Sequence, residues 1–381
     1  MIYLDHTSTC RLYPEVASYI KDNLDANFAN PAAAHSLGLK QEHLIKDSLA
    51  SLAKNLGCKP NELIVTSGAT EATNTAIFST VKKLHRKGKR IITTAGDHEA
   101  TTSCFRQLKQ DGFDAVEAPL TRSGTVNLEK LAELITNDTI LISFIHVSNE
   151  VGSINDIDAI VKLRNEKAPH ALIHVDCVQS WTKIPIHLKR CGVDFASFSG
   201  HKIHAPKGIG LLYVREKTAF VPLLYGGGQQ SARRSGTENP LLLAALALAA
   251  DIGTRDLDTN YRYVEQLNRF MRDSFADLPL VYNSPENAIP HILNISFPPA
   301  RGETLLHILA NREIYLSTTS ACSTAQNTKS HVLQAMGTHG ERLDSALRIS
   351  LAAENSMTEI ETAVQAIREA YEQLAAIGGR R

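Results

Sequence analysis

The feature that most constrains the fold is a series of short apolar runs separated by helical patterns. The runs are ELIVTS (62–67), RIITTA (90–95), TILISFIHV (139–147), ALIHVD (171–176), VDFASFS (193–199) and GIGLLYVR (208–215). Segments such as EATNTAIFSTVKKLHRK and INDIDAIVKLRNEKA lie between most of them. Continuous apolar strands that alternate with helices indicate a mostly parallel sheet with helices on both faces. The sequence therefore predicts an α/β fold.

A second, smaller α+β domain is predicted after about residue 255. Short strands are expected at HILNISF, EIYLS and LRISLA, and MTEIETAVQAIREAYEQLAAI is expected to close the chain as a long helix. We predict a large domain over residues 13–255 and a small domain formed by residues 1–12 and 256–381. The run LLLAALALAA is too short to span a bilayer and predicts a buried helix that starts at Pro240.

Charge and cysteine content narrow the class of protein. The 381 residues include 40 basic and 40 acidic side chains, which gives no general reason to expect binding to nucleic acid or membranes. The first residues, MIYLDHTSTC, do not resemble a secretion signal. The six cysteines form no CxxC pair, so we expect reduced thiols in a cytoplasmic protein and no metal site.

Polar residues follow four of the predicted strands, where a core would not select them. Because the carboxyl ends of parallel strands meet at one edge of a sheet, these residues should gather there. A single one is best explained as a structural polar group, whereas four strand ends together indicate a site. The residues are Asp97 and His98, Asn149 and Glu150, Asp176, and Ser199 with His201 and Lys202.

Two segments have the character of anion sites. In TSGATEATN, Gly68 and Ala69 form a small turn and Thr70 opens a helix, whose N-terminus would attract phosphate. A simple helix cap would use the same residue types. The glycine-rich segment YGGGQQSARRSGTENP carries Arg233 and Arg234. It would either contact an anion from a second side or form a surface loop.

Together these pieces suit a phosphorylated carbonyl cofactor. The amine of Lys202 is able to form a Schiff base with an aldehyde, and pyridoxal phosphate (PLP) needs such a lysine and an acid for its ring nitrogen. Asp176 would be that acid and His98 would stack on the ring. Thr70, Ser199 and His201 would contact the phosphate.

From YLDHTST to LRISLA, the chain resembles the cysteine desulfurases of the NifS/IscS type, which are PLP enzymes of fold type I within the class V aminotransferase-like group. The motifs that carry the resemblance are TSGATEATN, DHEAT, HVSNEVG, HVDCVQS, SFSGHKIHAPKGIG, RRSGTENP and SACST. The resemblance implies a seven-stranded, mostly parallel sheet in the large domain, L-cysteine as the substrate and PLP as the cofactor.

The resemblance also implies roles for matching residues. Lys202, Cys322 and His98 would be catalytic, and Asn149 and Arg348 would bind the substrate carboxylate. Thr237 would reach the phosphate of a neighbouring subunit, which implies a homodimer. The cofactor-binding set would be Ala69, Thr70, His98, Asn149, Asp176, Gln179 (at the phenolic oxygen), Ser199, His201, Lys202 and Thr237.

Cys322 lies in STTSACSTAQNT, a small and polar segment that predicts a loop rather than a core. The resemblance implies that its thiolate takes sulfur from L-cysteine as a persulfide and leaves L-alanine. A sulfur-acceptor protein would then receive the sulfur, and iron–sulfur assembly, tRNA thiolation and DNA phosphorothioation all stay open.

Several residues depart from the family pattern. Thr319 stands where glycine is common, Ala352 and Ala353 replace Gly-Arg, and His6, Cys10 and Arg11 replace tyrosine, threonine and proline. They put loop reach and substrate entry in question. Three alternatives stay open: a selenocysteine lyase, a small-substrate aminotransferase, and a non-catalytic scaffold that binds partners of a sulfur pathway.

Overall fold

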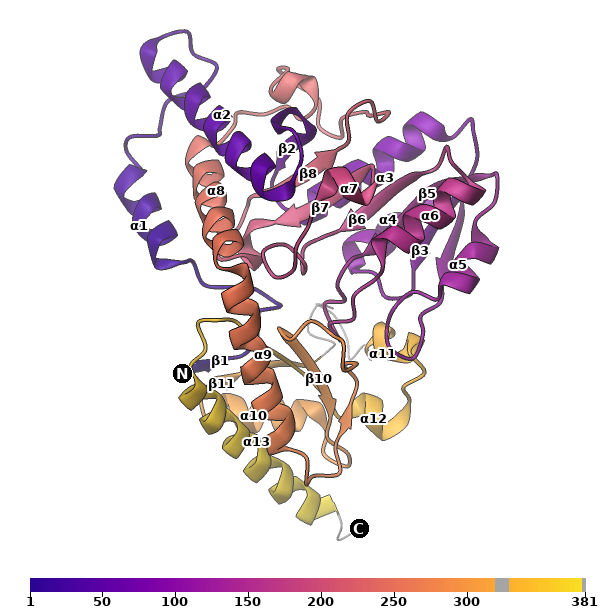
Figure 1. Ribbon diagram of the computed structural model, residues 1–381, viewed down its shortest axis with the longest axis vertical. Helices are drawn as coiled ribbons and strands as arrows, with labels where there is room; N and C mark the ends of the chain where they lie inside the picture. The colour runs from indigo at the N-terminus through magenta and orange to yellow at the C-terminus, as the bar shows by residue number, and fades with distance from the viewer. Residues whose placement is uncertain (319–328, 379–381) are drawn as a thin grey trace.

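The computed structural model describes residues 1–318 and 329–378. Its largest sheet has seven strands, in the order β2-β8-β7-β6-β5-β3-β4 (Figure 1). Neighbours from β7 to β4 run parallel, and β8 is antiparallel to both β7 and β2. The bounds are β2 (Leu63–Thr66), β3 (Arg90–Thr94), β4 (Asp114–Ala118), β5 (Thr139–Ile145), β6 (Leu172–Asp176), β7 (Phe195–Ser199) and β8 (Gly210–Val214). The mostly parallel sheet is confirmed, and each of the six apolar runs forms one of its strands.

The sequence analysis misses strand β4. Two of the five residues in its sequence, DAVEA, are acidic, and it lies at the edge of the sheet beside β3. Edge strands tolerate charged side chains because one side of the strand faces solvent. Arg90 of β3 forms an ion pair with Asp114 at 2.7 Å. Asp114 therefore supports the pairing of β4 with β3, although its charge makes the segment look unlike a strand in the sequence.

Helices cover both faces of this sheet. Successive side chains of a strand point to opposite faces, and Phe195 and Ala196 accordingly belong to different hydrophobic clusters. Phe195 packs with α3 (Ala69–Leu84), whereas the cluster of Ala196 includes α2 (Ser36–Leu56) and α8 (Pro240–Arg255). The buried helix predicted from Pro240 is confirmed. The other helices on these strands are α1 (Pro14–Asn23), α4 (Glu99–Gln110), α5 (Leu128–Leu134), α6 (Ile157–Lys167) and α7 (Leu188–Cys191).

A second hydrophobic core lies on a smaller antiparallel sheet, ordered β12-β13-β10-β9. Its strands are β9 (Val281–Tyr282), β10 (Ile292–Ser296), β12 (Ser317–Thr318) and β13 (Ala346–Ser350). In Figure 1 this sheet lies below the large one, beside α9 (Leu257–Ser274), α10 (Gly302–Ala310), α11 (His331–Ala335), α12 (Gly340–Asp344) and α13 (Met357–Gly378). The domain limits at residues 12 and 255 stay predictions.

The first residues of the chain join the second core. Strand β1 (Ile2–Tyr3) pairs in parallel with β11 (Ile314–Tyr315), and Leu4 is buried among residues of α9, α10 and α13. From there the chain passes to the carboxyl ends of β6 and β7. No helix in the described part of the chain is long and apolar enough to cross a membrane.

Candidate active site

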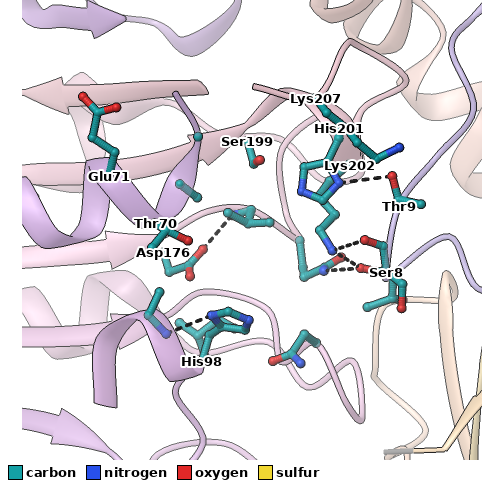
Figure 2. Close-up of a pocket in the computed structure, with 18 of the residues that line it drawn as sticks. Ser8, Thr9, Thr70, Glu71, His98, Asp176, Ser199, His201, Lys202 and Lys207 are labelled. Atoms are coloured by element: carbon teal, nitrogen blue, oxygen red, sulfur yellow. Dashed lines mark hydrogen bonds between the residues drawn. The ribbon is translucent and has the colours of Figure 1, made fainter. Parts of the chain in front are cut away.

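A cavity of about 570 Å³ lies at the carboxyl ends of β5, β6 and β7 (Figure 2). It brings together almost all of the predicted site residues: Ala69, Thr70, His98, Asn149, Asp176, Gln179, Ser199, His201, Lys202 and Arg348. Thr237 does not line it. Cys322 and Thr319 lie outside the described residues. Polar residues at the carboxyl ends of the parallel strands, such as His98, Asp176 and Lys202, therefore meet in one cavity, as the sequence predicts.

Lys202 points into this cavity from a single 3-10 turn, Gly200–Lys202, that directly follows β7. Its Nζ donates hydrogen bonds to the carbonyl oxygens of Thr7 and Ser8, the latter at 2.7 Å (Figure 2). The amine thus faces a polar wall formed by the N-terminal segment. An amine held at the edge of a cavity is placed to bond an aldehyde that binds there.

Asp176 is the last residue of β6 and is buried at the floor of the cavity. One of its oxygens accepts a hydrogen bond from the backbone N–H of Val178 at 2.9 Å. Burial raises the pKa of the Asp176 carboxyl, while His98, the Val178 N–H and Lys202 act in the opposite direction. A buried carboxylate of this kind is stabilised by a cationic partner, and the protonated ring nitrogen of PLP fits that need.

His98 is the N-cap residue of α4, and its Nδ1 accepts the backbone N–H of Ala100 at 3.1 Å. In the neutral ring the proton is therefore on Nε2. The turn before it is fixed by the buried Asp97, whose carboxylate oxygens accept the backbone N–H groups of Thr94 and Ile145. Asp97 is thus a structural polar residue that places His98.

The N-terminus of α3 opens on the cavity through Gly68, Ala69 and Thr70. Strand β8 approaches this turn so closely that a Cβ on Gly210 would lie 2.7 Å from the Cα of Gly68. The free N–H groups of a helix of this length form a site for phosphate. Ser199 and His201 lie beside it (Figure 2). Burial, and then Lys202, lowers the pKa of His201 to about 4.

Arg348, in β13, is buried and also lines the cavity. Its Nη1 donates to the carbonyl oxygen of Asn149 at 3.1 Å, and its Nη2 donates to Asp5 at 3.0 Å and to the hydroxyl of Ser8 at 2.8 Å. Among residues 1–318 and 329–378, its buried Nε has no hydrogen-bond partner. A buried guanidinium with an unpaired N–H suits a carboxylate ligand. The lysine, the buried acid, the helix N-terminus and this arginine together fit PLP with an amino-acid substrate.

The sequence analysis gives no site role to Thr7, Ser8 and Thr9, which form one wall of the cavity. Their contacts with Lys202, His201 and Arg348 span 195, 192 and 340 residues of the chain, respectively. No local sequence pattern predicts such contacts. The only indication in the sequence is the group of small polar residues in HTST.

The two arginines expected to hold an anion are engaged elsewhere within the chain. Arg234 forms an ion pair with Glu71 at 2.9 Å. Arg233 donates to the carbonyl oxygen of Asn61 and lies over the ring of Phe220. Neither residue lines the cavity.

The departures from the family pattern at residues 6, 10, 11 and 352–353 lie close together in space. His6 Nδ1 lies 3.2 Å from Glu354, which follows Ala353, and the thiol of Cys10 donates to the carbonyl oxygen of His6. The carbonyl oxygen of Arg11 contacts His204 at 2.9 Å. These positions therefore form one connected region behind the wall of the cavity.

Comparison with known proteins places this geometry in a family. The family model Aminotransferase class-V matches residues 2–362. Cysteine desulfurase IscS of Serratia proteamaculans (strain 568) is 36% identical over 380 residues, which cover 98% of this chain and 93% of that protein.

Two solved structures are similar over nearly the whole chain. A NifS-like protein superposes with a TM-score of 0.92 at 32% identity, covering 98% of this chain and 99% of the other. A structure described as SspA in complex with cysteine has a TM-score of 0.83 at 31% identity, covering 93% of this chain and 100% of the other. Family members depend on PLP. The chain therefore belongs to the class V aminotransferase family, as a cysteine desulfurase of the NifS/IscS type.

Proposed function

We propose that this cysteine desulfurase collects the sulfur of L-cysteine as a persulfide on Cys322, releases L-alanine, and passes the sulfur to an acceptor protein. The observation that carries the proposal is the convergence of Lys202, Asp176 and Arg348 on one cavity. Such a cavity offers a covalent anchor, an acid for the cofactor ring and a receptor for an amino-acid carboxylate.

When bound, PLP supplies an aldehyde that bonds amines and a ring that accepts the electron pair released at the substrate α-carbon. Lys202 holds the aldehyde at rest and carries the α-proton during turnover. Asp176 keeps a proton on the ring nitrogen, and His98 stacks on the ring and assists proton transfer. Gln179 donates to the phenolic oxygen, while Ala69, Thr70, Ser199 and His201 bind the phosphate.

Arg348 and Asn149 bind the substrate carboxylate. The unpaired Nε of Arg348 supports this role, since a carboxylate oxygen would satisfy it. The cysteine complex of the similar SspA structure supports the same substrate.

Cys322 supplies the second nucleophile. Its thiolate attacks the substrate sulfur, the carbon–sulfur bond breaks, and the electron pair of that bond stays with the carbon fragment, which is protonated to L-alanine. The outer sulfur of the persulfide keeps the proton of the substrate thiol, and the proton that Cys322 loses on ionisation is matched by the one that the carbon fragment gains. The carbon fragment is reduced as the sulfur is oxidised, so no external oxidant is needed. The described residues that flank the segment support the assignment: Ser317 pairs with Arg348 in the sheet, and Ser330 donates to Glu150, which follows Asn149.

The test uses Cys322→Ser and Lys202→Ala in the holoenzyme. Cys322→Ser should bind PLP and L-cysteine normally but lose alanine production and protein-bound sulfur. Lys202→Ala should no longer be linked to the cofactor by borohydride. Cys58→Ser, which alters a half-buried thiol outside the cavity, is the matched control and should leave both readouts unchanged. Sulfur that still loads onto Cys322→Ser would refute the proposal.

We further propose a homodimer in which Thr237 of each subunit completes the phosphate site of the other. Exposed apolar side chains support an interface, including Phe28 at 74% and Tyr225 at 66% exposure. Arg234, three residues before Thr237, is tied to Glu71 at the edge of the cavity.

Mixing the Lys202→Ala and Thr237→Ala proteins under conditions of subunit exchange tests this dimer. A mixed dimer would carry one site with both defects and one intact site, so activity should reappear on mixing. Two inactive proteins that stay inactive after verified exchange would exclude a shared site.

The last part of the proposal concerns the protein that accepts the sulfur from Cys322. Iron–sulfur assembly, tRNA thiolation and DNA phosphorothioation proteins are the candidate classes. Tracing labelled sulfur from the loaded enzyme into a cell lysate, followed by mass spectrometry, distinguishes them. The five described cysteines are free thiols, and the cytoplasmic location stays a prediction.

A further inference from the structure

Lys183 is a lysine beside the cavity to which the reaction described above gives no role. It lies in the turn that follows β6, and its Nζ donates to Oε1 of Gln179 at 3.1 Å. No carboxylate of residues 1–318 or 329–378 forms an ion pair with it. Its side-chain partner is therefore a neutral amide that belongs to the cofactor site.

The contact fixes the orientation of that amide. Burial lowers the pKa of Lys183, but its Nζ donates to Oε1, so the oxygen of the Gln179 amide faces the lysine. The NH2 group then lies on the opposite side, where Nε2 donates to the carbonyl oxygen of Thr7 at 3.1 Å. Nε2 carries a second hydrogen, and Gln179, which is 3% exposed, lines the cavity.

We propose that Lys183 is a positioning residue that holds the NH2 group of Gln179 toward the phenolic oxygen of bound PLP. The inference rests on the role proposed for Gln179. Without Lys183, only the carbonyl oxygen of Thr7 still orients the amide, and an amide that turned over would present its own oxygen to the phenolic oxygen. A hydrogen-bond donor that stabilises this anionic oxygen would be replaced by a repulsive acceptor.

The test is the pH midpoint at which the visible absorption of the bound cofactor changes. An N–H donor to the phenolic oxygen favours its ionised form, so losing the donor should raise the midpoint. Lys183→Met should raise it by about one pH unit, a tenfold change in the proton equilibrium. Lys183→Arg keeps a donor and should stay close to the parent enzyme. Lys189→Met, at an exposed lysine, is the matched control.

A double-mutant cycle separates an effect of Lys183 through the Gln179 amide from a direct electrostatic effect of its charge on the cofactor. Lys183 also carries a charge that acts on several titratable groups, namely His6, Cys10, His201, His204 and His291. If it acts through the amide, Lys183→Met should add no shift to Gln179→Ala. An equal shift in both backgrounds, or none in either, overturns the inference.

Two further outcomes are distinguishable. If Gln179→Ala alone leaves the midpoint unchanged, the proposed role of Gln179 fails, and the inference about Lys183 fails with it. If Lys183→Met does not fold, Lys183→Ala takes its place in the cycle, with cofactor content and circular dichroism as checks. A midpoint of Lys183→Ala that matches the parent enzyme also overturns the inference.

Discussion

At the scale of single residues, Arg348 connects the two ends of the chain with the substrate side of the cavity. Its guanidinium contacts Asp5 and Ser8 from the N-terminal segment and Asn149 from the turn after β5. These three partners hold the planar group in one orientation with Nε unpaired. A side chain held in this way is preorganised for the carboxylate that we propose it binds.

Arg348→Lys should weaken cysteine binding because a lysine ammonium does not offer the planar fork of a guanidinium or reach all three partners. We expect KM for L-cysteine to rise by about tenfold or more, with a smaller change in kcat. Steady-state kinetics with a fixed cofactor content measure both. Arg312→Lys, at a half-exposed surface ion pair, should change neither value. An unchanged KM in Arg348→Lys would contradict the role of this residue.

Sequence reasoning succeeds for residues that follow strands and fails for residues recruited from afar. Asp176 ends one apolar run and Lys202 lies three residues after another, so their place at the sheet edge follows from the fold class. Ser8 contacts Arg348, which is 340 residues away in the sequence. The positioning role proposed for Lys183 depends on its contact with the Gln179 amide. Their positions depend on packing between distant segments, which no local periodicity records.

At the scale of elements, the junction of β8 with the turn before α3 shapes the end of the cavity where we propose that the phosphate binds. A Cβ on Gly210 would lie 2.4 Å from the carbonyl oxygen of Phe198 and 2.7 Å from the Cα of Gly68. Both neighbours are backbone atoms and have little freedom to move. The absence of a side chain at Gly210 is what lets the strand and the helix N-terminus meet.

Gly210→Ala should therefore lower stability by about 1–3 kcal/mol and weaken PLP binding, since the turn that opens α3 must shift. Thermal unfolding and cofactor titration measure the two effects. Gly112→Ala is the control, because its Cβ would meet nothing within 4 Å and its cost comes from the positive φ of 85° alone. Cofactor affinity should survive in that variant. Normal affinity in Gly210→Ala would show that the turn adapts.

Which elements are visible in the sequence follows from their surroundings. The six apolar runs were predicted because a strand buried on both faces must be apolar throughout. Strand β4 was not predicted because it lies at the edge of the sheet and carries charged residues. Strands β1 and β9 were not predicted because a strand of two residues shows no alternating pattern. Short strands are determined by the partners they pair with.

At the scale of the whole molecule, the protein carries a set of buried histidines that favour the neutral form. Burial is the largest cause in each case. It lowers the pKa of His6 and His174 to about 3 and that of His146, His201 and His204 to about 4, and it lowers the pKa of His291 well below its usual value. The unfolded chain binds protons at these positions near pH 6.5, whereas the folded chain does not.

Stability should consequently fall as the pH drops from about 6.5 toward 4. At these histidines the unfolded state binds more protons than the native state in this range, so their contribution to the free energy of unfolding rises with pH, whereas the raised pKa of Asp97, about 6, acts in the opposite direction. Urea unfolding of the holoenzyme at several pH values measures the slope. His174→Gln should reduce it, since His174 is buried between Ser143 and Ser197. His85→Gln, at an exposed residue, should leave it unchanged.

The chain's first ten residues meet a strand near its end, with Asp5 bound to a partner 343 positions later. A ribosome releases this wall of the cavity early and the arginine that completes it late. A nascent or prematurely terminated product would therefore have no finished pocket. Cofactor uptake should therefore begin only once the chain has been synthesised at least as far as Arg348, the last residue along the chain that lines the cavity.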